Sequence, residues 1–407
     1  MTKRNWGSFV GLGAAGLMLA GIAAPEVHAG VKVPIKDDAY LDLGFRLQVL
    51  TMLTQNDIDG DGQWDNMINH RVRRGRLRVK AATNDWFSAF IQTEVAADGG
   101  SGVDMRVIDA FIQMNLDPWA QVFVGENMAP TNRQNLTSSG ALMAIDRPGI
   151  AYHSLNWGNR SVYRYGTATL PGSASGVGSG DAPVRDVGIT LFGAGKVGEN
   201  ANLKYYVGTY NGVHAASENS ERITARAQLN FFDAEDGYYN SSTYLGKKKT
   251  AGIGASIDMM PNVAAVVDKN GEATTADFTC LSVDGFMEMP AGEHTVTAEV
   301  GIVMPDFGDY FQNATGMGFY GQAGLLIQKV WQPWVAYEMF SSDDDNDAGN
   351  YSMIRIGGTR YFAGQNANIK VGVEILTSDN PILSASDGTD GNEDSALTGV
   401  IGFYTTW

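Results

Sequence analysis

The sequence predicts an all-β fold, a transmembrane antiparallel β-barrel of 16–18 strands. Three observations support this prediction: apolar and polar residues alternate along much of the chain, its connections alternate between short and long, and no stretch of about 18 apolar residues follows residue 30. The 50 glycines and abundant aromatic residues also fit a chain of strands and turns with aromatic residues at membrane interfaces. Two soluble domains are the alternative that the length allows.

Residues 1–29 predict a cleaved signal peptide, which leaves the barrel at residues 30–407. Lys3 and Arg4 give a positively charged start, an apolar stretch covers residues 9–24, and Val27-His28-Ala29 supplies small residues before the cleavage point. A membrane anchor is the alternative, but Gly and Ala dominate the stretch and no basic cluster follows it. An exported chain without a helical anchor is either soluble or spans an outer membrane as a barrel.

The early strands are predicted in order at residues 39–54, 69–82, 86–97 and 105–115, with a fifth beginning at Trp119. Short turns follow the second and fourth strands, while long loops follow the first, third and fifth. This alternation is typical of membrane barrels, which have short periplasmic turns and longer outer loops. The later predicted segments are 161–169, 184–192, 202–210, 222–232, 248–258, 263–268, 276–288, 294–304, 317–328, 334–340, 352–361, 368–377 and 397–407.

The strand at residues 69–82 carries a row of four cations. Arg74, Arg76, Arg78 and Lys80 share one face, and the residues between them are small or apolar. Same-face neighbours lie about 6.8 Å apart in a strand, which is less than the Debye length of about 8 Å, so their fields overlap. In a wet lumen the row would form a positive track for anions. In an ordinary sheet it would be a solvated face paired with acidic neighbours.

Acidic residues on the next strands bear on the strength of this track. Glu94 and Asp109 are expected to face the same lumen and to neutralise part of the positive charge. Opposite charges across a lumen produce a transverse field that selects weakly between ions, so general diffusion is favoured over sharp anion selectivity. The predicted pore-lining residues are Arg74, Arg76, Arg78, Lys80, Glu94, Asp109, Gln113, Arg133 and Arg147.

The first long loop carries a possible calcium site. Asp57, Asp59, Asp61 and Asp65 supply closely spaced carboxylates on a glycine-bent segment, and Gln63 supplies a backbone carbonyl. Calcium binds six to eight oxygen ligands of this kind, and the spacing resembles extracellular calcium loops and half of an EF-hand. The bidentate acid of a full EF-hand is missing. The segment has two alternative interpretations: a site for a structural Ca²⁺ that stiffens the loop, or a solvated acidic turn.

The composition also excludes several functions. A net charge of −16 argues against nucleic-acid binding. The single cysteine, Cys280, forms no internal disulfide. The remaining histidines are scattered at His70, His153, His214 and His294, and no GxSxG, HExxH or CxxCH motif is present, so we do not expect an enzyme or a required cofactor.

Several short motifs between residues 39 and 150 resemble the phosphate-selective porin family of the O and P type. These motifs are RRGRLRVK at 73–80, IDAFIQ at 108–113, VGE at 124–126 and LTSS at 136–139. The resemblance implies a trimeric, 16-stranded, water-filled channel in the bacterial outer membrane. It also implies an inward-folded third outer loop and basic residues that line the pore. Arg133 and Arg147 are the arginines of the expected third-loop region.

The sequence therefore predicts an outer-membrane porin that passes small hydrophilic solutes or ions passively, with lipid around it. Two alternatives remain. A barrel that serves as a scaffold for a partner protein, such as an exported electron-transfer cytochrome, would not conduct alone. A secreted β-rich binding protein would stay soluble without detergent.

Overall fold

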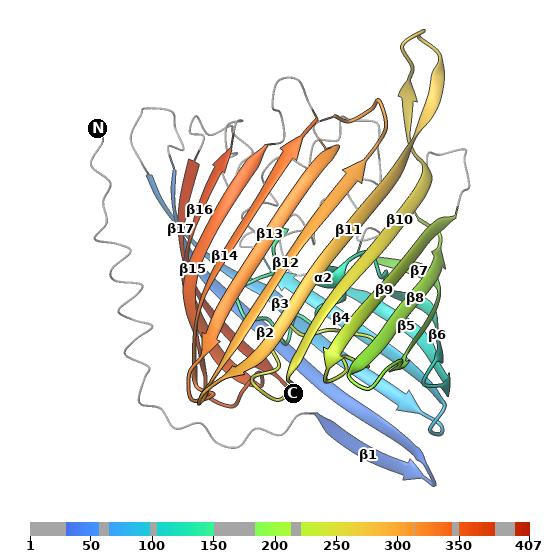
Figure 1. The fold of residues 1–407 in the computed structure, drawn as a ribbon, viewed down its shortest axis with the longest axis vertical. Coiled ribbons are helices and arrows are strands. Elements are labelled where there is room, and N and C mark those ends of the chain that lie inside the picture. Colours follow the sequence, from blue (N-terminus) through green and yellow to red (C-terminus); the bar gives the residue numbers. More distant parts are fainter. Residues whose placement is uncertain are drawn as a thin grey trace.

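The computed structural model describes residues 30–56, 65–97, 104–149, 184–212, 221–312, 314–343, 350–378 and 395–407. Within these residues the chain forms a closed antiparallel barrel of 16 strands, β2–β17 (Figure 1). The barrel closes because β17 pairs with β2 over Leu397↔Gln55 to Thr406↔Arg46. The predicted barrel and its strand number are confirmed.

The elements follow one another around the barrel in chain order. They are β1 (Val31–Lys36), β2 (Ala39–Asn56), β3 (Asp65–Ala82), β4 (Phe87–Ala97), β5 (Asp104–Asp117), β6 (Ala120–Met128), α2 (Arg133–Leu136), β7 (Arg185–Lys196), β8 (Ala201–Tyr210), β9 (Arg222–Phe232), β10 (Thr250–Val267), β11 (Ala273–Ala291), β12 (His294–Asp306), β13 (Gly316–Leu326), β14 (Trp331–Ser342), β15 (Tyr351–Tyr361), β16 (Ala367–Ser378) and β17 (Ser395–Thr406).

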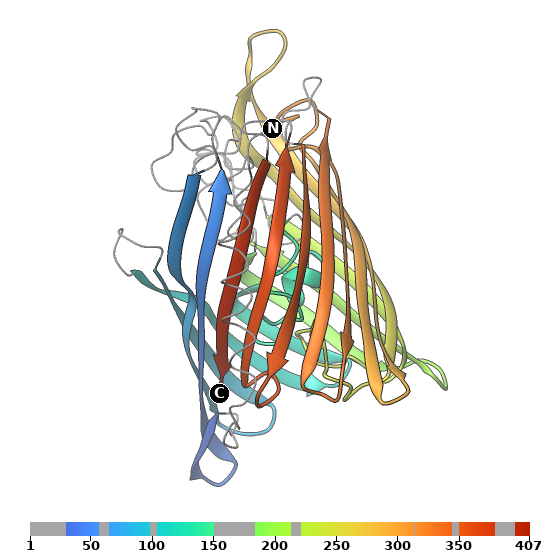
Figure 2. The ribbon, with the colours of Figure 1, turned by 90° about the vertical axis from the view of Figure 1, so that its left-hand side faces the viewer.

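Two strand predictions differ from the structure. β1 was not among the predicted strands; it forms a hairpin with the start of β2 and projects beyond the rim that carries the C-terminus (Figures 1 and 2). The segments predicted at 248–258 and 263–268 are one strand, β10, because a register shift between Met260 and Ala264 carries the ladder past the irregularity. The segment predicted at 161–169 and the expected signal peptide at 1–29 lie outside the described residues.

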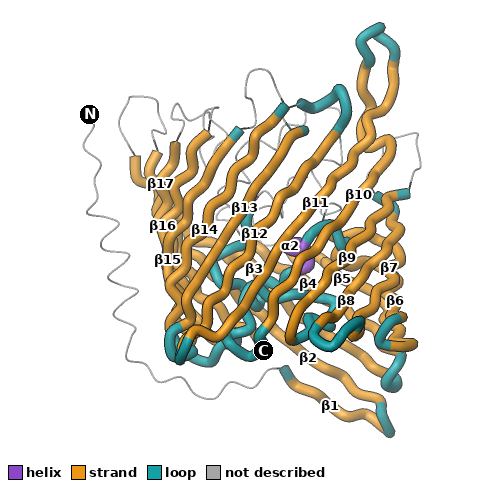
Figure 3. Tube along the Cα trace, viewed as in Figure 1, coloured by secondary structure: helices purple, strands orange, loops and turns teal. Residues whose placement is uncertain are grey.

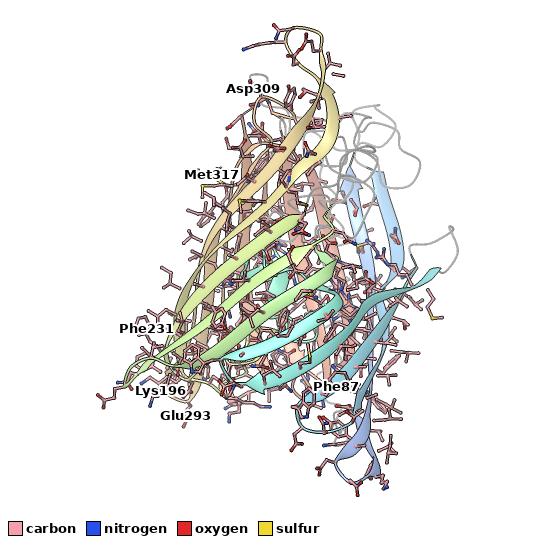
Figure 4. All side chains as sticks on the ribbon, turned by 90° about the vertical axis from the view of Figure 1, so that its right-hand side faces the viewer. Phe87, Lys196, Phe231, Glu293, Asp309 and Met317 are labelled. Atoms are coloured by element: carbon pink, nitrogen blue, oxygen red, sulfur yellow. The ribbon has the colours of Figure 1, made fainter. Side chains whose placement is uncertain are left out.

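Alternation along the strands separates an apolar exterior from a polar interior. Large apolar side chains such as Ile189, Ile253 and Val283 are exposed on the outside, and Phe231 and Met317 project from the wall in Figure 4. Many inward positions are polar or charged and buried, and a cluster of apolar and aromatic side chains that includes Met260, Phe278 and Tyr320 is buried with them. An apolar outer surface around an interior that carries polar side chains is typical of a barrel that crosses an outer membrane.

The third outer loop leaves β6 and turns into the barrel. Ala129 N donates to Val184 O (3.0 Å), which closes the base of the loop. Almost all of residues 129–149 are buried, and Figure 3 shows α2, the one helix of the described residues, within the outline of the barrel. The predicted inward-folded third loop is therefore confirmed.

None of the helical segments described is long and apolar enough to cross a membrane.

Candidate channel constriction

The third loop first contacts the wall formed by β10–β12. Asn132 caps α2, because its side chain accepts from Asn135 N (2.8 Å). Ser256 on β10 donates to Thr131 O (2.6 Å), and Arg133 N donates to Asp284 on β11 (3.3 Å). The short helix is thus fixed against one side of the lumen.

The loop then crosses to β2 and β3. Arg46 and Arg76 both donate to Ser139 Oγ, at 2.5 and 3.1 Å, and Gln48 donates to Ser139 O at 2.6 Å. Gly140 allows this close approach, since a Cβ there would lie 2.5 Å from an Arg46 guanidinium nitrogen. The wall arginines therefore bind the loop at Ser139.

The last described residues of this part of the loop, 142–149, run along β14–β17. Lys370 donates to Ala144 O (2.9 Å), Tyr404 to Ile145 O (2.8 Å), and Arg355 to Asp146 O (3.0 Å). The Asp146 carboxylate reaches the other way, to Arg73 (2.8 Å) and Arg74 (3.2 Å) on β3. Asp146 therefore ties the loop to β3 while its backbone is held by β15.

A β-bulge in β3 makes this double contact possible. Gln48 pairs with Arg74 and Val49 pairs with Val72, so Arg73 is the extra residue. A bulge re-aims a side chain that strict alternation would direct outward. Arg73 and Arg74 consequently both reach Asp146 inside the barrel.

Two sides of the constriction differ in charge. The arginine side, on β2–β4 and residues 139–147 of the loop, gathers more arginines than acids. The acid side, on β7–β12, α2 and the β9–β10 connection, gathers more acids than cations. The arginine side consists of Arg46, Arg73, Arg74, Arg76 and Arg147 with Glu94 and Asp146; the acid side consists of Asp186, Glu235, Asp258, Asp284, Glu288 and Glu299 with Arg133, Arg185, Lys204, Arg222 and Arg226.

Ion pairs on the acid side link its strands to one another across the inner face of the wall. Arg226 binds Asp284 bidentately at 2.6 and 2.8 Å, and Arg222 binds Asp258 at 2.7 Å and Asp186 at 3.3 Å. By strand order β10 and β11 stand opposite β2 and β3 in a barrel of 16 strands. The two sides therefore face each other across the lumen.

The row of cations on β3 divides into two halves. Arg74 and Arg76 are buried at the constriction, where Arg76 pairs with Glu94 at 2.5 Å. Arg78 and Lys80 are half-buried nearer the rim of short turns, and Arg78 donates to Trp407 O (2.8 Å). The row is thus tied to acids at its upper end and partly open to water at its lower end.

The other predicted residues also lie on the barrel wall or the loop. Asp109 is buried and binds Arg185 (3.0 Å) rather than the β3 row. Gln113 is half-buried and donates to Asn115 (2.7 Å). Arg147 N donates to the Asp146 carboxylate (2.9 Å), and its guanidinium also donates to Thr137 O.

The charges around two loop carboxyls shift their pKa values. Burial alone would raise the pKa of Asp146, but Arg73 and Arg74 outweigh it and hold that pKa well below its usual range. Burial opposes ionisation of Glu235 as well, and the neighbouring Arg133 guanidinium again keeps its pKa low. Both groups are therefore carboxylates at neutral pH.

Sequence reasoning missed several constriction residues. Strict alternation placed Arg73 on the outer face, because the bulge in β3 cannot be recognised from the sequence. Asp146, Arg355 and Lys370 are far apart in the sequence and come together only when the loop folds inward. Glu235 lies in the connection 233–249, which by parity belongs to the rim of short turns yet is long. In the strand order predicted from the sequence, the segment at 161–169 shifts this parity by one, so the length of the connection could not indicate an additional inward segment.

The predicted calcium ligands Asp57, Asp59, Asp61 and Gln63 lie outside the described residues, and Asp65 begins β3. Among the residues that the structure describes, no group of three or more His, Cys, Asp or Glu side chains is placed to hold a metal ion. The calcium site remains a prediction from the sequence.

Solved structures with the same architecture are outer-membrane proteins. An anion-selective porin from Comamonas acidovorans aligns with a TM-score of 0.54 at 12% identity, over 91% of this chain and 100% of that one. OprB of Pseudomonas putida gives 0.53 at 9% identity, over 90% and 94%. OmpT of Vibrio cholerae gives 0.51 at 13% identity, over 93% and 100%.

The chain has the fold of bacterial outer-membrane porins. At these identities the likeness establishes the fold alone. The apolar outer surface of the barrel fits a location in a bacterial outer membrane. No protein-family model and no curated protein sequence matches the chain. The resemblance to phosphate-selective porins therefore stays a hypothesis within a confirmed barrel class.

Proposed function

We propose that the protein is a porin, a channel through which small hydrophilic solutes and ions diffuse passively across the outer membrane. The observation that carries this proposal is a closed barrel with a polar interior, narrowed midway by an inward-folded third loop. A wet lumen lets solutes pass without crossing hydrocarbon, and a constriction limits their size.

A weak preference for anions is the finer part of the proposal. Inward cations that contact water lie along β3 and β5: Arg78 and Lys80 are half-buried, and Arg106, which approaches Glu94 at 3.6 Å, has a side chain that is 49% exposed. The carboxylates of the acid side are buried in contacts with the wall and the inward segments. Asp42 stands opposite Lys80 in the β2–β3 register and offsets one of these charges, so the proposed preference for anions is weak.

Planar-bilayer recordings test both parts. Purified protein should produce stepwise conductance, and a KCl gradient should give a reversal potential that favours chloride. In the R78A/K80A double variant the preference should fall by about twofold per charge, since a unit charge about 8 Å away in water contributes about 0.5 kcal/mol. Absence of conductance would contradict the porin proposal. A cation preference in the unmodified protein would contradict the anion preference alone.

A homotrimer is the assembly we propose, because the family resemblance implies it. Light scattering of the detergent-solubilised protein should give three times the mass of one chain, and a monomer mass would contradict it. The cytochrome-scaffold alternative gains no support, because the described segments 129–149 and 233–249 occupy the space that a partner inside the barrel would need.

A further inference from the structure

The connection between β9 and β10 differs from the other turns on its rim. Asp233 N donates to Lys249 O (2.9 Å), and Lys249 N donates to the Asp233 carboxylate (2.6 Å), so its two ends lie side by side. A two-residue hairpin would suffice to join strands this close. The chain instead inserts residues 234–248, of which Glu235, Tyr238 and Asn240 are buried.

This connection meets the third outer loop inside the barrel. Thr137 and Asn240 form a parallel β-bridge, in which Asn240 N donates to Leu136 O and Ser138 N donates to Asn240 O, both at 2.9 Å. Ser242 N donates to Ala141 O at 3.0 Å. A segment from the rim of short turns and a loop from the opposite rim therefore join through backbone hydrogen bonds in the lumen.

Glu235 is the central contact between the two segments. It accepts two hydrogen bonds from the Arg133 guanidinium, at 2.9 and 2.8 Å, and one each from Gln228 (2.7 Å) and Asn230 (2.9 Å) on β9. The Tyr244 hydroxyl donates to it as well. A bidentate arginine contact is both strong and directional, so one carboxylate fixes α2, the connection and the wall relative to one another.

The tip of the connection borders the open part of the lumen. Tyr238 packs among inward-facing aromatic rings, 4.6 Å from Phe123 and 4.8 Å from Phe192 between ring centroids. The next residue, Tyr239, is 37% exposed. Its ring packs edge-on against Tyr238, with 5.0 Å between ring centroids, so it stands beside the aromatic cluster and still contacts water.

We propose that residues 233–249 form a second constricting element, and that the channel is narrowed jointly by this connection and the third loop. Glu235 acts as the positioning residue that holds them together. The largest solute that passes is then set by both segments, and Tyr239 lies at the edge of the passage. This inference rests on the proposed porin function.

Shortening the connection is the most direct test. Residues 234–248 are replaced by Asn-Gly, which suits a two-residue hairpin between Asp233 and Lys249. Single-channel conductance should rise about twofold or more, because ion current grows with the open cross-section, and larger neutral sugars should enter proteoliposomes. Unchanged conductance and an unchanged sugar size limit in a correctly folded variant would overturn the inference.

Point variants keep the test decisive if the shortened chain fails to fold. E235Q should raise conductance and the sugar size limit, and E235D, which keeps the charge, should restore most of the original behaviour. T315V is the control, because Thr315 is buried in the connection between β12 and β13 at the other rim, where its hydroxyl accepts from Phe307 N at 3.0 Å. It should lower thermal stability with conductance unchanged. Equal effects of E235Q and T315V on conductance would assign Glu235 a merely structural role.

The outcomes also separate this inference from the porin proposal. If the unmodified protein conducts and the variants conduct equally, only the second constricting element is refuted. If no form conducts, the porin function fails, and the inference that rests on it fails too. Conductance in the shortened variant alone would support the connection as a complete block and contradict passive diffusion through the unmodified protein.

Discussion

The two sides of the constriction use the same residue types in opposite proportions. On the acid side, each arginine has at least one carboxylate of its own, as Arg226 has Asp284. On the arginine side, Arg73 and Arg74 share Asp146, and Arg46 binds hydroxyl groups. Removing one partner of a matched buried ion pair is costly, because the other charge stays buried without compensation. Removing one arginine from a cluster of arginines costs less, because the neighbouring positive charges already disfavour its charged form. The acid side is therefore expected to hold the lumen together, whereas single arginines on the arginine side are expected to contribute less to stability. Passing ions meet the water-exposed cations of β3 and β5.

The R226A substitution should have the largest effect on stability. It leaves the Asp284 carboxylate buried and deprived of its bidentate partner, which costs about 3–5 kcal/mol of unfolding free energy. Urea unfolding in lipid vesicles measures the loss. The ion preference should stay the same, because this pair is buried away from the water-exposed cations of β3 and β5.

The double variant R226A/D284A provides the control. Removing both partners should recover much of the stability, since no charge is left uncompensated. If R226A alone proved nearly neutral, the acid side would not depend on its matched pairs and the contrast with the arginine side would disappear.

Lowering the pH should reduce the unfolding free energy by an intermediate amount, through one carboxylate on each side of the constriction. The folded-state pKa values of Asp146 and Glu235 are lowered, so each carboxylate stabilises the fold above its unfolded pKa of about 4. That contribution is lost as pH falls through the lower, folded values. The unfolding free energy should therefore be flat from pH 7 to about pH 4 and fall below it.

The D146N variant checks the assignment. It should be less stable at pH 7 and should lose less stability on acidification than the unmodified protein, because one of the titrating groups is gone. A steep loss of stability between pH 7 and pH 5 would point to other groups.

The barrel could be predicted from sequence because its signals are local. Alternation in β2–β5 and the parity of short and long connections both follow from strand geometry and from which rim a turn occupies. The β1 hairpin was missed because it continues the first strand backwards beyond the membrane wall. The break expected within β10 was wrong because a bulge lets a strand continue through an irregular stretch.

The constriction could be predicted only where strand geometry alone decides it. Arg74 and Arg76 were assigned to one face by alternation and lie inside the barrel. Their partners were not predictable, because Asp146 reaches them from a loop and Glu94 depends on the register of β3 and β4. Glu235 required knowing that a connection on the short-turn rim folds inward, which is a property of tertiary packing rather than of any local pattern.

The R46A substitution should have the smallest effect, although Arg46, like Arg226, is buried. It removes hydrogen bonds to Ser139 and Thr406, but it also removes a guanidinium from a cluster that already has more arginines than acids. No carboxylate loses its partner, so the loss should stay below about 1 kcal/mol, near the net value of an ordinary hydrogen bond. Urea unfolding beside R226A gives the comparison directly. A loss as large as that of R226A would mean that burial of an arginine, and not its pairing, determines what each side contributes to stability.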